Sequence, residues 1–440
     1  MKKPLQKWIL MLVLFTLLMP GLSVKADMPE INGSSAVVFD LDSFELIYTK
    51  DMDSPMYPAS ITKLITALVF SDHYSARKTE YLTYPQEAKL VPAFAIYWNL
   101  YNIPVGTEFT ADEMMHALLI RSFNDASMVV AMNVAGSEEA FVELMNEKAQ
   151  ELGMNNSQFR NSSGLDHEEQ LTTAYDLMFL LKAAYEDPWI REVMSKQSHE
   201  LKTKDMTLGL MENTNKHVGL FGNILGKTGT TSLAGRNFAG IYQREGRTLG
   251  SIILRSNYPN DPENLRIFED TQRLVDSAFL EERIIKLSKS EEVGLLQVSY
   301  RPYRFFGPTK EMEIPVKSED SLSYYRNDVN LREAVVNLTY KEVTASDVKV
   351  DSIVGTAILK ERHRETTVNL LATVDMEKEI LKTHLLSYIL ITLTTLTVTI
   401  LILFLVIRAR QKKLARRRRI EAARKKRKYV DERGKKGFLE

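Results

Sequence analysis

The 440-residue chain contains no cysteine, so disulfide bonds, lipid-modified cysteines and thiolate metal sites are all excluded. Its seven histidines form no H-E-x-x-H string, which argues against a zinc hydrolase. The sequence also lacks G-x-S-x-G, the string that carries the nucleophilic serine of α/β-hydrolases. Gly226, Lys227 and Thr228 imitate the end of a phosphate-binding loop, but Phe221 stands where that motif requires its first glycine. Neither a metal site nor a nucleotide site is predicted, and we expect no cofactor.

Residues 1–26 have the order of a secretory signal peptide. Three lysines precede or flank an apolar run over residues 8–22, and small or apolar residues stand three and one positions before Asp27. We therefore predict export and cleavage before Asp27. The alternative, an N-terminal membrane anchor, is disfavoured because the apolar run is short for a bilayer span.

A second apolar segment, residues 385–407, is 23 residues long and carries no charged side chain. As a helix it would measure about 34 Å at a rise of about 1.5 Å per residue. That length is enough to cross a hydrocarbon core of about 30 Å, and it disfavours the alternative of a buried core helix. Residues 408–440 follow with 16 Lys and Arg against 4 Asp and Glu. The positive-inside rule places this tail in the cytoplasm and the exported body outside.

The net charge of zero hides a strong separation of charge along the chain. The tail carries +12 and residues 1–26 carry +4, so residues 27–407 carry −16. A basic tail by itself can indicate nucleic-acid binding. Because this one directly follows a membrane span, anionic lipid headgroups are the favoured partner, and no nucleic acid is expected.

Three short strings follow one another in the exported part of the chain. Ser60 and Lys63 form S-x-x-K, Ser122 and Asn124 form S-x-N, and K-T-G begins at Lys227. Closely similar strings mark the active sites of serine acyl-transfer enzymes, and three in this order rarely coincide by chance. We therefore interpret them as one active site. The alternative is a helix cap, a loop serine and a strand lysine with no shared function.

S-x-x-K alone is weak evidence, because about two chance matches are expected in a chain of this length. Two further matches do occur, beginning at Ser75 and Ser346. Ser75 lies in a charged stretch with no apolar helix behind it, and Ser346 follows K-T-G among predicted strands. Ser60 instead precedes an apolar run typical of the buried side of a helix, which puts Lys63 one turn away on the same face.

The exported body is predicted to form two domains. Residues 27–283 have β-rich ends around a helical middle, which predicts an α/β (α+β) domain with a mostly antiparallel sheet. Residues 284–376 show only strand-like runs and predict a small all-β domain without a helix. Residues 377–384 are left as a short stalk before the membrane span.

Local signals place the three motifs on particular elements. The S-x-x-K string opens a helix, and a capping box at Thr110 begins the helix that ends just before the S-x-N string. K-T-G lies on the first of three strands, over residues 223–231, and Glu245 and Gly246 make the tight turn between the other two. In the small domain, residues 331–339 form one of five predicted strands.

The chemistry of these residue types fits attack on a peptide carbonyl, which needs a nucleophile, a base and a stabilised oxyanion. The hydroxyl of Ser60 is a weak nucleophile, and a neutral Lys63 could take its proton. Burial and a second positive charge both lower the pKa of a lysine, and Lys227 would supply that charge. Ser122 could relay a proton to the leaving amine, and Asn124 could hold the substrate amide.

The three motifs resemble those of the D-alanyl-D-alanine carboxypeptidases, the low-molecular-weight penicillin-binding proteins. The resemblance covers about residues 35–376 and includes lesser strings at residues 161–166 and 172–176. It implies a penicillin-binding or β-lactamase-like transpeptidase domain, a small all-β domain between enzyme and membrane, and here one C-terminal transmembrane helix. It also implies an oxyanion hole formed by the backbone N–H groups of Ser60 and Thr230.

Two departures from the family pattern bear on substrate binding. The middle residue of S-x-N is usually small, and this chain has Phe123, which would narrow the cleft or shift the substrate preference. The family also has an arginine near the start of the last helix that receives the substrate carboxylate. Arg266 is the nearest candidate for it, and Thr228 and Thr230 could share the role. Gly229 would let the K-T-G strand approach the extended substrate closely.

These observations predict a membrane-anchored serine-type D-Ala-D-Ala carboxypeptidase in the cell membrane of a Gram-positive bacterium. It would remove the terminal D-alanine from peptidoglycan stem pentapeptides through an acyl-Ser60 intermediate. Its partners would be those stem peptides, β-lactam antibiotics that acylate the same serine, and membrane lipid contacted by residues 385–407 and the basic tail.

Three alternatives remain open at this point. A D,D-transpeptidase would pass the same acyl group to an amine, and the sequence does not separate the two reactions. A serine β-lactamase is disfavoured, because it needs a fast deacylating base and would leave the β domain and the membrane span without a purpose. A catalytically silent wall-binding scaffold would share the fold without the reaction.

Overall fold

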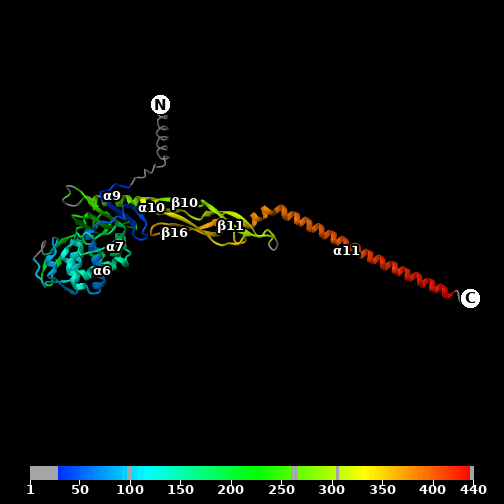
Figure 1. Cartoon of the computed structure of the whole chain (residues 1–440), viewed down its shortest axis with the longest axis horizontal. Helices are drawn as coiled ribbons and strands as arrows, with labels where there is room; N and C mark the ends of the chain where they lie inside the picture. The colour runs from blue at the N-terminus through cyan, green and yellow to red at the C-terminus, as the bar shows by residue number, and fades with distance from the viewer. Residues whose placement is uncertain are drawn as a thin grey trace, which may run out of the picture. The chain divides into compact units, whose positions relative to one another are not determined.

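The computed structural model describes residues 28–92, 94–96, 102–258, 261, 265–303 and 307–436. The predicted signal peptide lies outside the described residues. By its internal contacts the chain divides into two compact units, which are described separately (Figure 1). Unit 1 comprises the described residues up to Leu287 together with Ser321–Asn337 and Ile358–Thr367. Unit 2 comprises Ser288–Asp320, Leu338–Ala357 and the described residues from Val368 onward.

A five-stranded sheet in unit 1 has the strand order β2–β1–β9–β8–β7, and every neighbouring pair is antiparallel, as predicted. Its strands are β1 (Ser35–Asp40), β2 (Leu46–Lys50), β7 (Asn223–Thr231), β8 (Gly235–Arg244) and β9 (Arg247–Ser256). Glu245 and Gly246 both have positive φ, 48° and 81°, as the predicted tight turn between β8 and β9 requires. β7, which carries K-T-G, lies at the end of this order, so one of its edges has no neighbouring strand among the described residues.

Helices fill the middle of unit 1, as the sequence predicts. They are α2 (Lys63–Tyr74), α4 (Ala111–His116), α5 (Asn124–Ala135), α6 (Glu138–Glu151), α7 (Ala174–Glu186), α8 (Pro188–Met194) and α9 (Arg266–Leu280). The Thr110 hydroxyl accepts a hydrogen bond from the Glu113 amide, which confirms the predicted N-cap of α4. The Glu113 carboxylate, which a full capping box would direct back to Thr110, accepts from the Lys202 amide instead.

The sheet is buried on both faces, because successive residues of a strand point to opposite sides. Val37 and Phe39 belong to the main core, which also contains the inner faces of α2, α5 and α7. Ala36 and Val38 face the other way and pack with Leu274 of α9. Unit 1 also contains two short antiparallel pairs: β3 (Tyr81–Thr83) with β4 (Glu108–Thr110), and β5 (Ser198–Lys202) with β6 (Thr207–Glu212). The sequence patterns did not predict these pairs.

A second five-stranded sheet forms from the C-terminal part of the chain. Its order is β11–β12–β16–β15–β14, with β11 (Glu292–Tyr300), β12 (Lys310–Ser318), β14 (Val335–Tyr340), β15 (Ile353–Lys360) and β16 (Glu365–Ala372). These strands account for the five predicted strand-like runs. A separate pair, β10 (Arg283–Leu287) with β13 (Leu322–Tyr325), has no counterpart among the predictions.

One prediction for this region is wrong, because a helix does interrupt the strands. The sequence predicts a single strand over residues 331–339, but α10 (Asp328–Glu333) occupies its first residues and β14 begins only at Val335. The side chain of Asn327 accepts a hydrogen bond from the Asn330 amide and caps α10. A six-residue helix is too short to show an apolar period, so this capping residue is the only sequence signal for α10.

The C-terminal helix α11 (Met376–Lys436) has the length and composition to cross a membrane, with a mean hydropathy of 2.7 in its most apolar stretch. It contains the predicted span, residues 385–407. The residues predicted as a stalk, 377–384, form its first turns, and its described part continues into the basic tail (Figure 1). Among the described residues, this is the helix that supports a membrane anchor.

Candidate active site

Ser60 lies in a short 3-10 turn, η1 (Ala59–Thr62), that runs directly into α2 at Lys63. The turn places the Lys63 amine next to Ser60, with 2.9 Å between Nζ and Oγ. Ala59 has a φ of 48°, a left-handed conformation that an L-residue adopts only when its surroundings enforce it. Part of that enforcement comes from Asn237 on β8, whose side-chain amide donates to the carbonyl oxygens of Tyr57 and Pro58.

Two glycines allow other segments to approach this turn more closely than any side chain would permit. A Cβ atom on Gly164 would lie 1.9 Å from the Ala59 carbonyl oxygen, and Gly164 also has a φ of +87°. A Cβ atom on Gly229, the glycine of K-T-G, would lie 3.0 Å from both the Pro58 carbonyl oxygen and the Ser60 amide nitrogen. The close approach predicted for Gly229 is therefore present, and the neighbour it meets is the Ser60 turn.

The S-x-N string follows a π-helical turn, η3 (Ala117–Arg121), that continues α4. Such turns are rare and occur often at functional sites. Ser122 ends it in the left-handed conformation, with φ 67° and ψ 33°, and α5 begins at Asn124. Phe123 is 1% exposed and belongs to the main core, so it packs behind the motif rather than narrowing open space in front of it.

The Lys63 amine connects the first two motifs. It is fully buried and donates to the side-chain oxygen of Asn124 at 2.7 Å and to the backbone carbonyl of Ser163 at 2.6 Å, besides its contact with Ser60. The sequence placed Ser163 in a lesser family string but gave it no role. A backbone carbonyl has no sequence signature, so this acceptor was not predictable from residue types.

The Lys227 amine connects the second and third motifs. It is also fully buried, and it donates to the Ser122 hydroxyl at 2.7 Å and to the Thr228 carbonyl at 3.2 Å. Five of the predicted site residues thus form two hydrogen-bonded groups, one around each lysine, listed from the N-terminus as Ser60, Lys63, Ser122, Asn124 and Lys227.

Burial changes the charge state of both lysines. It lowers the pKa of Lys227 to about 7, because the ammonium form loses its hydration. The pKa of Lys63 also falls well below its usual 10.5, mainly through burial and further through the positive charge of Lys227, with Asp125 acting in the opposite direction. Both causes favour the neutral form of the amine beside the Ser60 hydroxyl, which is the direction that a general base requires.

The remaining predicted residues lie along or beyond the K-T-G strand. The Thr228 hydroxyl donates to the hydroxyl of Thr214 at 2.8 Å, and the Thr214 amide donates to the carbonyl of Ile120 in η3. Through these two hydrogen bonds, Thr214 links the turn before Ser122 to the K-T-G strand. The sequence did not predict this role. Thr230 is exposed at the open end of the strand.

Arg266 is not brought into these hydrogen-bonded groups. It is exposed at the first residue of α9, and its backbone amide donates to the carboxylate of Asp261. No hydrogen bond or ion pair joins its guanidinium to another site residue within the part of the chain that the structure describes. Its suggested role in holding the substrate carboxylate stays a prediction.

The two other S-x-x-K matches lack this geometry. Ser75 is the exposed C-cap residue of α2, and the Lys78 amine lies over the ring of Trp189, 5.1 Å from its centroid. Ser346 is exposed in a loop, where its hydroxyl contacts that of Thr344. The context that separated Ser60 from these serines in the sequence corresponds to a real difference in burial and contacts.

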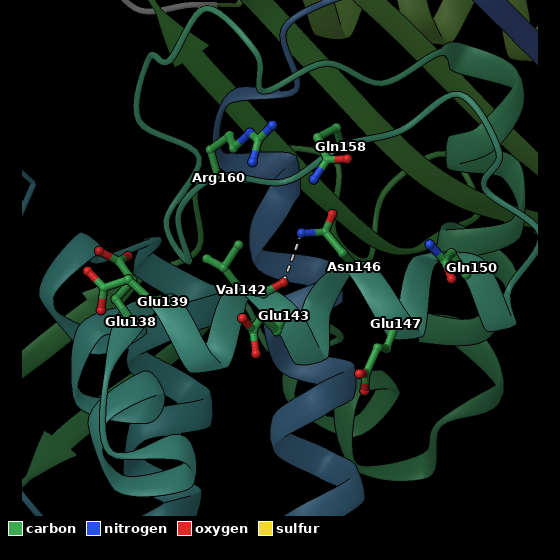
Figure 2. A pocket seen from close by; sticks show the side chains of 9 residues that line it. All are labelled: Glu138, Glu139, Val142, Glu143, Asn146, Glu147, Gln150, Gln158 and Arg160. Atoms are coloured by element: carbon green, nitrogen blue, oxygen red, sulfur yellow. Dashed lines mark hydrogen bonds between the residues drawn. The ribbon is translucent and has the colours of Figure 1, made fainter.

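A large surface hollow lies apart from these residues (Figure 2). It has a volume of about 560 Å³ and follows α6, where four glutamates line it together with Asn146, Gln158 and Arg160. One of those glutamates, Glu138, accepts hydrogen bonds from the amide and hydroxyl of Ser162. The hollow contains none of the three motifs, so we assign it no catalytic role.

A family model described as D-alanyl-D-alanine carboxypeptidase matches residues 23–257, more than half of the chain. The chain belongs to this family. It is therefore a serine-type hydrolase of the D-alanyl-D-alanine carboxypeptidase class, as the three motifs predicted. The match covers S-x-x-K, S-x-N and K-T-G, and ends at the last strand of the first sheet.

Individual members of the family resemble the chain over different lengths. The D-alanyl-D-alanine carboxypeptidase DacF of Bacillus subtilis is 25% identical over 335 residues, which cover 74% of this chain and 81% of the relative. DacA of Escherichia coli is 30% identical over 218 residues, 48% of this chain and 52% of the relative. The similarity to DacF thus extends beyond the catalytic motifs into the C-terminal sheet.

Solved structures agree on the fold. The D-alanyl-D-alanine carboxypeptidase of Mycobacterium tuberculosis H37Rv is 25% identical, with a TM-score of 0.53 over 59% of this chain and 96% of that chain. Penicillin binding protein 5 from Haemophilus influenzae is 19% identical, with a TM-score of 0.55 over 80% of this chain and 99% of that chain. The predicted penicillin-binding protein fold, with its antiparallel sheets and helical region, is confirmed.

Proposed function

We propose that the protein is a membrane-anchored D,D-carboxypeptidase that removes the terminal D-alanine from peptidoglycan stem pentapeptides through an acyl-Ser60 intermediate. The observation that carries this proposal is the contact of a fully buried lysine amine with the Ser60 hydroxyl, 2.9 Å from Nζ to Oγ. Membership of the family supplies the reaction class, and the contact supplies a specific nucleophile and base.

In the first step, neutral Lys63 takes the Ser60 proton while Oγ attacks the carbonyl carbon of the penultimate D-alanine. The oxyanion that forms would be stabilised by the backbone N–H groups of Ser60 and Thr230. As the C–N bond breaks, the leaving D-alanine nitrogen takes a proton from the Ser122 hydroxyl, which Lys227 can replace through its 2.7 Å hydrogen bond. The products of this half-reaction are D-alanine and an ester on Ser60.

In the second step, water attacks the ester carbonyl and gives a proton through Ser122 to Lys227, which lost its own proton in the first step. Lys63 returns the proton that it took to the Ser60 oxygen as the shortened peptide leaves, so both lysines and Ser60 are restored. A β-lactam would follow the first step with a ring nitrogen as the tethered leaving group. Asn124 would hold the substrate amide, and Lys227, Thr228 and Thr230 would surround its terminal carboxylate. The hydrogen bond between Lys63 and Asn124 and that between Lys227 and the Thr228 carbonyl support these roles, and the role of Thr230 rests on its residue type and its exposure on the same strand.

The anchor belongs to the same proposal. The span over residues 385–407 would hold the catalytic unit outside the cell after removal of a signal peptide, with the basic tail inside. External protease should then digest the catalytic unit of intact cells and leave the tail protected. A tail that is cleaved while the catalytic unit survives would contradict this orientation.

One experiment separates the activities that this site could support. Full-length protein in detergent is incubated with a stem pentapeptide and an amine acceptor, and the products are weighed by mass spectrometry. Release of D-alanine with a free carboxylate on the peptide supports a carboxypeptidase, whereas a dominant adduct with the acceptor indicates a transpeptidase. The absence of both products from folded protein would indicate a scaffold.

Matched serine variants assign the nucleophile in the same assay. Ser60→Ala should abolish D-alanine release and covalent labelling by penicillin. Ser75→Ala is the control, because it removes the exposed serine of another S-x-x-K match, at the opposite end of α2 from Ser60. Labelling of the Ser60→Ala protein would overturn the assignment.

A further inference from the structure

A small group of aromatic side chains joins the end of β11 and the residues after it to the first turns of α11, all within unit 2. The hydroxyl of Tyr300 and the ring nitrogen Nε2 of His384 are 2.9 Å apart. The hydroxyl of Tyr388 donates to the carbonyl of Pro302 at 2.5 Å, and the ring of Tyr388 meets that of Tyr303 edge-on, with 5.8 Å between centroids. The last residue of β11 and the residues directly after it are therefore held against one side of the helix.

The position of this contact along α11 decides its depth in a bilayer. The uncharged run begins at Leu385. At about 1.5 Å per residue, Tyr388 lies about 4.5 Å further along the helix. A run of about 34 Å centred on a hydrocarbon core of about 30 Å starts about 2 Å outside that core, so Tyr388 falls near its boundary. Pro302 and Tyr303 touch Tyr388 and must lie at a similar depth.

The chemistry of the contact suits that depth. Tyrosine is enriched at membrane–water interfaces, because its ring is apolar and its hydroxyl stays hydrogen-bonded. The Pro302 carbonyl, which would otherwise lose water near lipid, accepts from Tyr388. Arg301, the residue before Pro302, is exposed, and its positive charge would be attracted to the phosphate groups of the lipid headgroups.

We propose that the residues directly after β11 form a second membrane-contacting surface, which lies in the headgroup layer of a phospholipid bilayer beside the span. Exposed Arg301 and half-buried Tyr303 would face the headgroups, and buried Pro302 would hold them against Tyr388. This inference rests on the proposed span but goes beyond it, because a span alone leaves the attached unit free to stand away from the lipid. With two contacts on one rigid unit, the sheet would be held at a fixed tilt to the membrane.

The absence of cysteine makes a direct test available, since each introduced cysteine is the single site of labelling. Full-length variants Arg301→Cys, Lys289→Cys and Thr399→Cys are labelled with an environment-sensitive fluorophore and reconstituted in vesicles of phosphatidylcholine and phosphatidylglycerol. Quenching is measured with lipids that carry a spin label on the headgroup or in mid-chain. Lys289 is the matched control, because it is a basic, exposed residue of unit 2 beyond the opposite end of β11.

The proposal predicts that headgroup spin labels quench most of the fluorescence of the label at position 301. The fluorescence of the label at position 289 should not be quenched. The label at position 399, in the middle of the span, should be quenched by mid-chain spin labels. Quenching at 399 with equal, weak quenching at 301 and 289 would overturn the membrane contact at position 301 and leave the span intact. Lack of quenching at 399 would overturn the span and with it both proposals.

A second variant tests whether the fluorophore at position 301 enters the bilayer only because of its own affinity for lipid. Tyr388→Phe keeps the ring but removes the hydroxyl that holds Pro302. It should reduce headgroup quenching at position 301 and leave quenching at position 399 unchanged. Undiminished quenching at 301 in this background would show that the aromatic contact does not hold these residues at the membrane, and would contradict the proposal.

Discussion

Lys63 and Lys227 are buried at the candidate active site with neutral groups as their hydrogen-bond partners, whereas Glu45, elsewhere in unit 1, is buried between two arginines. The Glu45 carboxylate, 1% exposed, accepts hydrogen bonds from Arg283 and Arg364. Burial without an opposite charge lowers the pKa of both lysines, and the proposed mechanism uses one of them as a base. Glu45 instead forms ion pairs with two arginines, and we expect it to serve structure.

Glu361 lies between these two extremes. It is buried near Glu45, neither of its oxygens receives a hydrogen bond from the described residues, and the nearest cation, Arg364, is 3.8 Å away. Burial and the charge of Glu45 raise the pKa of Glu361 to about 7. The comparison therefore predicts that a buried titratable group is chemically active when hydrogen bonds and opposite charges only partly stabilise its charge, provided that a substrate can reach it.

The largest effect is expected for Lys63→Arg. Arginine keeps the positive charge but does not become a neutral base, so acylation should fall by about 10²- to 10⁴-fold while the protein stays folded. The measurement is the rate of penicillin labelling from pH 5 to 10. The parent rate should rise with pH as Lys63 loses its proton, and the variant should lack that rise. Near-parent labelling of Lys63→Arg would place the base elsewhere.

Glu45→Ala should have a large effect of the opposite kind. Two partly exposed arginines would lose their carboxylate partner, and the loss of these charge-assisted hydrogen bonds costs about 2 kcal/mol of unfolding free energy. Urea denaturation measures that loss, and penicillin labelling of the folded fraction should be unchanged. If labelling were lost while stability was kept, the distinction between structural and reactive charge would fail.

Lys227→Met should sharpen the comparison, because methionine removes the charge while keeping similar volume. With its pKa near 7, Lys227 binds fewer protons when folded than when unfolded between about pH 7 and 10.5, so its penalty to stability is complete below pH 7 and disappears as pH rises. The variant should therefore be more stable than the parent at pH 6, as thermal unfolding would show.

The same variant should lose activity. Acylation by substrates with a free terminal carboxylate should fall, and the rising limb of the pH profile should move to higher pH, because Lys63 no longer has a positive neighbour. A peptide with a terminal carboxamide is the control and should be affected less. Identical pH profiles in variant and parent would contradict the coupling between the two lysines.

Thr214→Val should have the smallest effect. Thr228 donates its hydroxyl proton to Thr214, which leaves the Thr214 proton available to the substrate carboxylate. Loss of one such hydrogen bond corresponds to about 1 kcal/mol, or roughly fivefold in kcat/KM. Thr214→Ser should keep the activity. If Val lowered kcat/KM equally for carboxylate and carboxamide substrates, Thr214 would act through packing alone.

The proposed catalytic residues were the most predictable part of the candidate site. A nucleophile, its base and a second lysine must be of fixed type, so motifs and their order singled out Ser60, Lys63 and Lys227, and the structure brings each of them into one of the two hydrogen-bonded groups. The hydrogen-bond partners of these residues were harder to predict from the sequence. The Ser163 carbonyl belongs to the backbone, and threonine is too common for Thr214 to stand out.

The helices and strands also differ in how well the sequence predicts them. The five strands of the first sheet and the longer helices have apolar periods that extend over many residues, and the sequence predicts them. α10, β10 and β13 are four to six residues long and depend on contacts with distant segments. Phe123 shows the same limit, because its type suggested a cleft residue and only the packing of α5 reveals that it faces the core.

Gly164 and Gly229 have a consequence at the level of the gene. Any missense change in a glycine codon adds at least a Cβ atom. At Gly164 that atom would overlap the carbonyl next to Ser60, and at Gly229 it would press on the same turn at 3.0 Å. If the proposed mechanism holds, a mutation at either position that displaced Ser60 far enough to prevent acylation by a β-lactam would also prevent acylation by the substrate, so neither codon would offer a selective route to resistance.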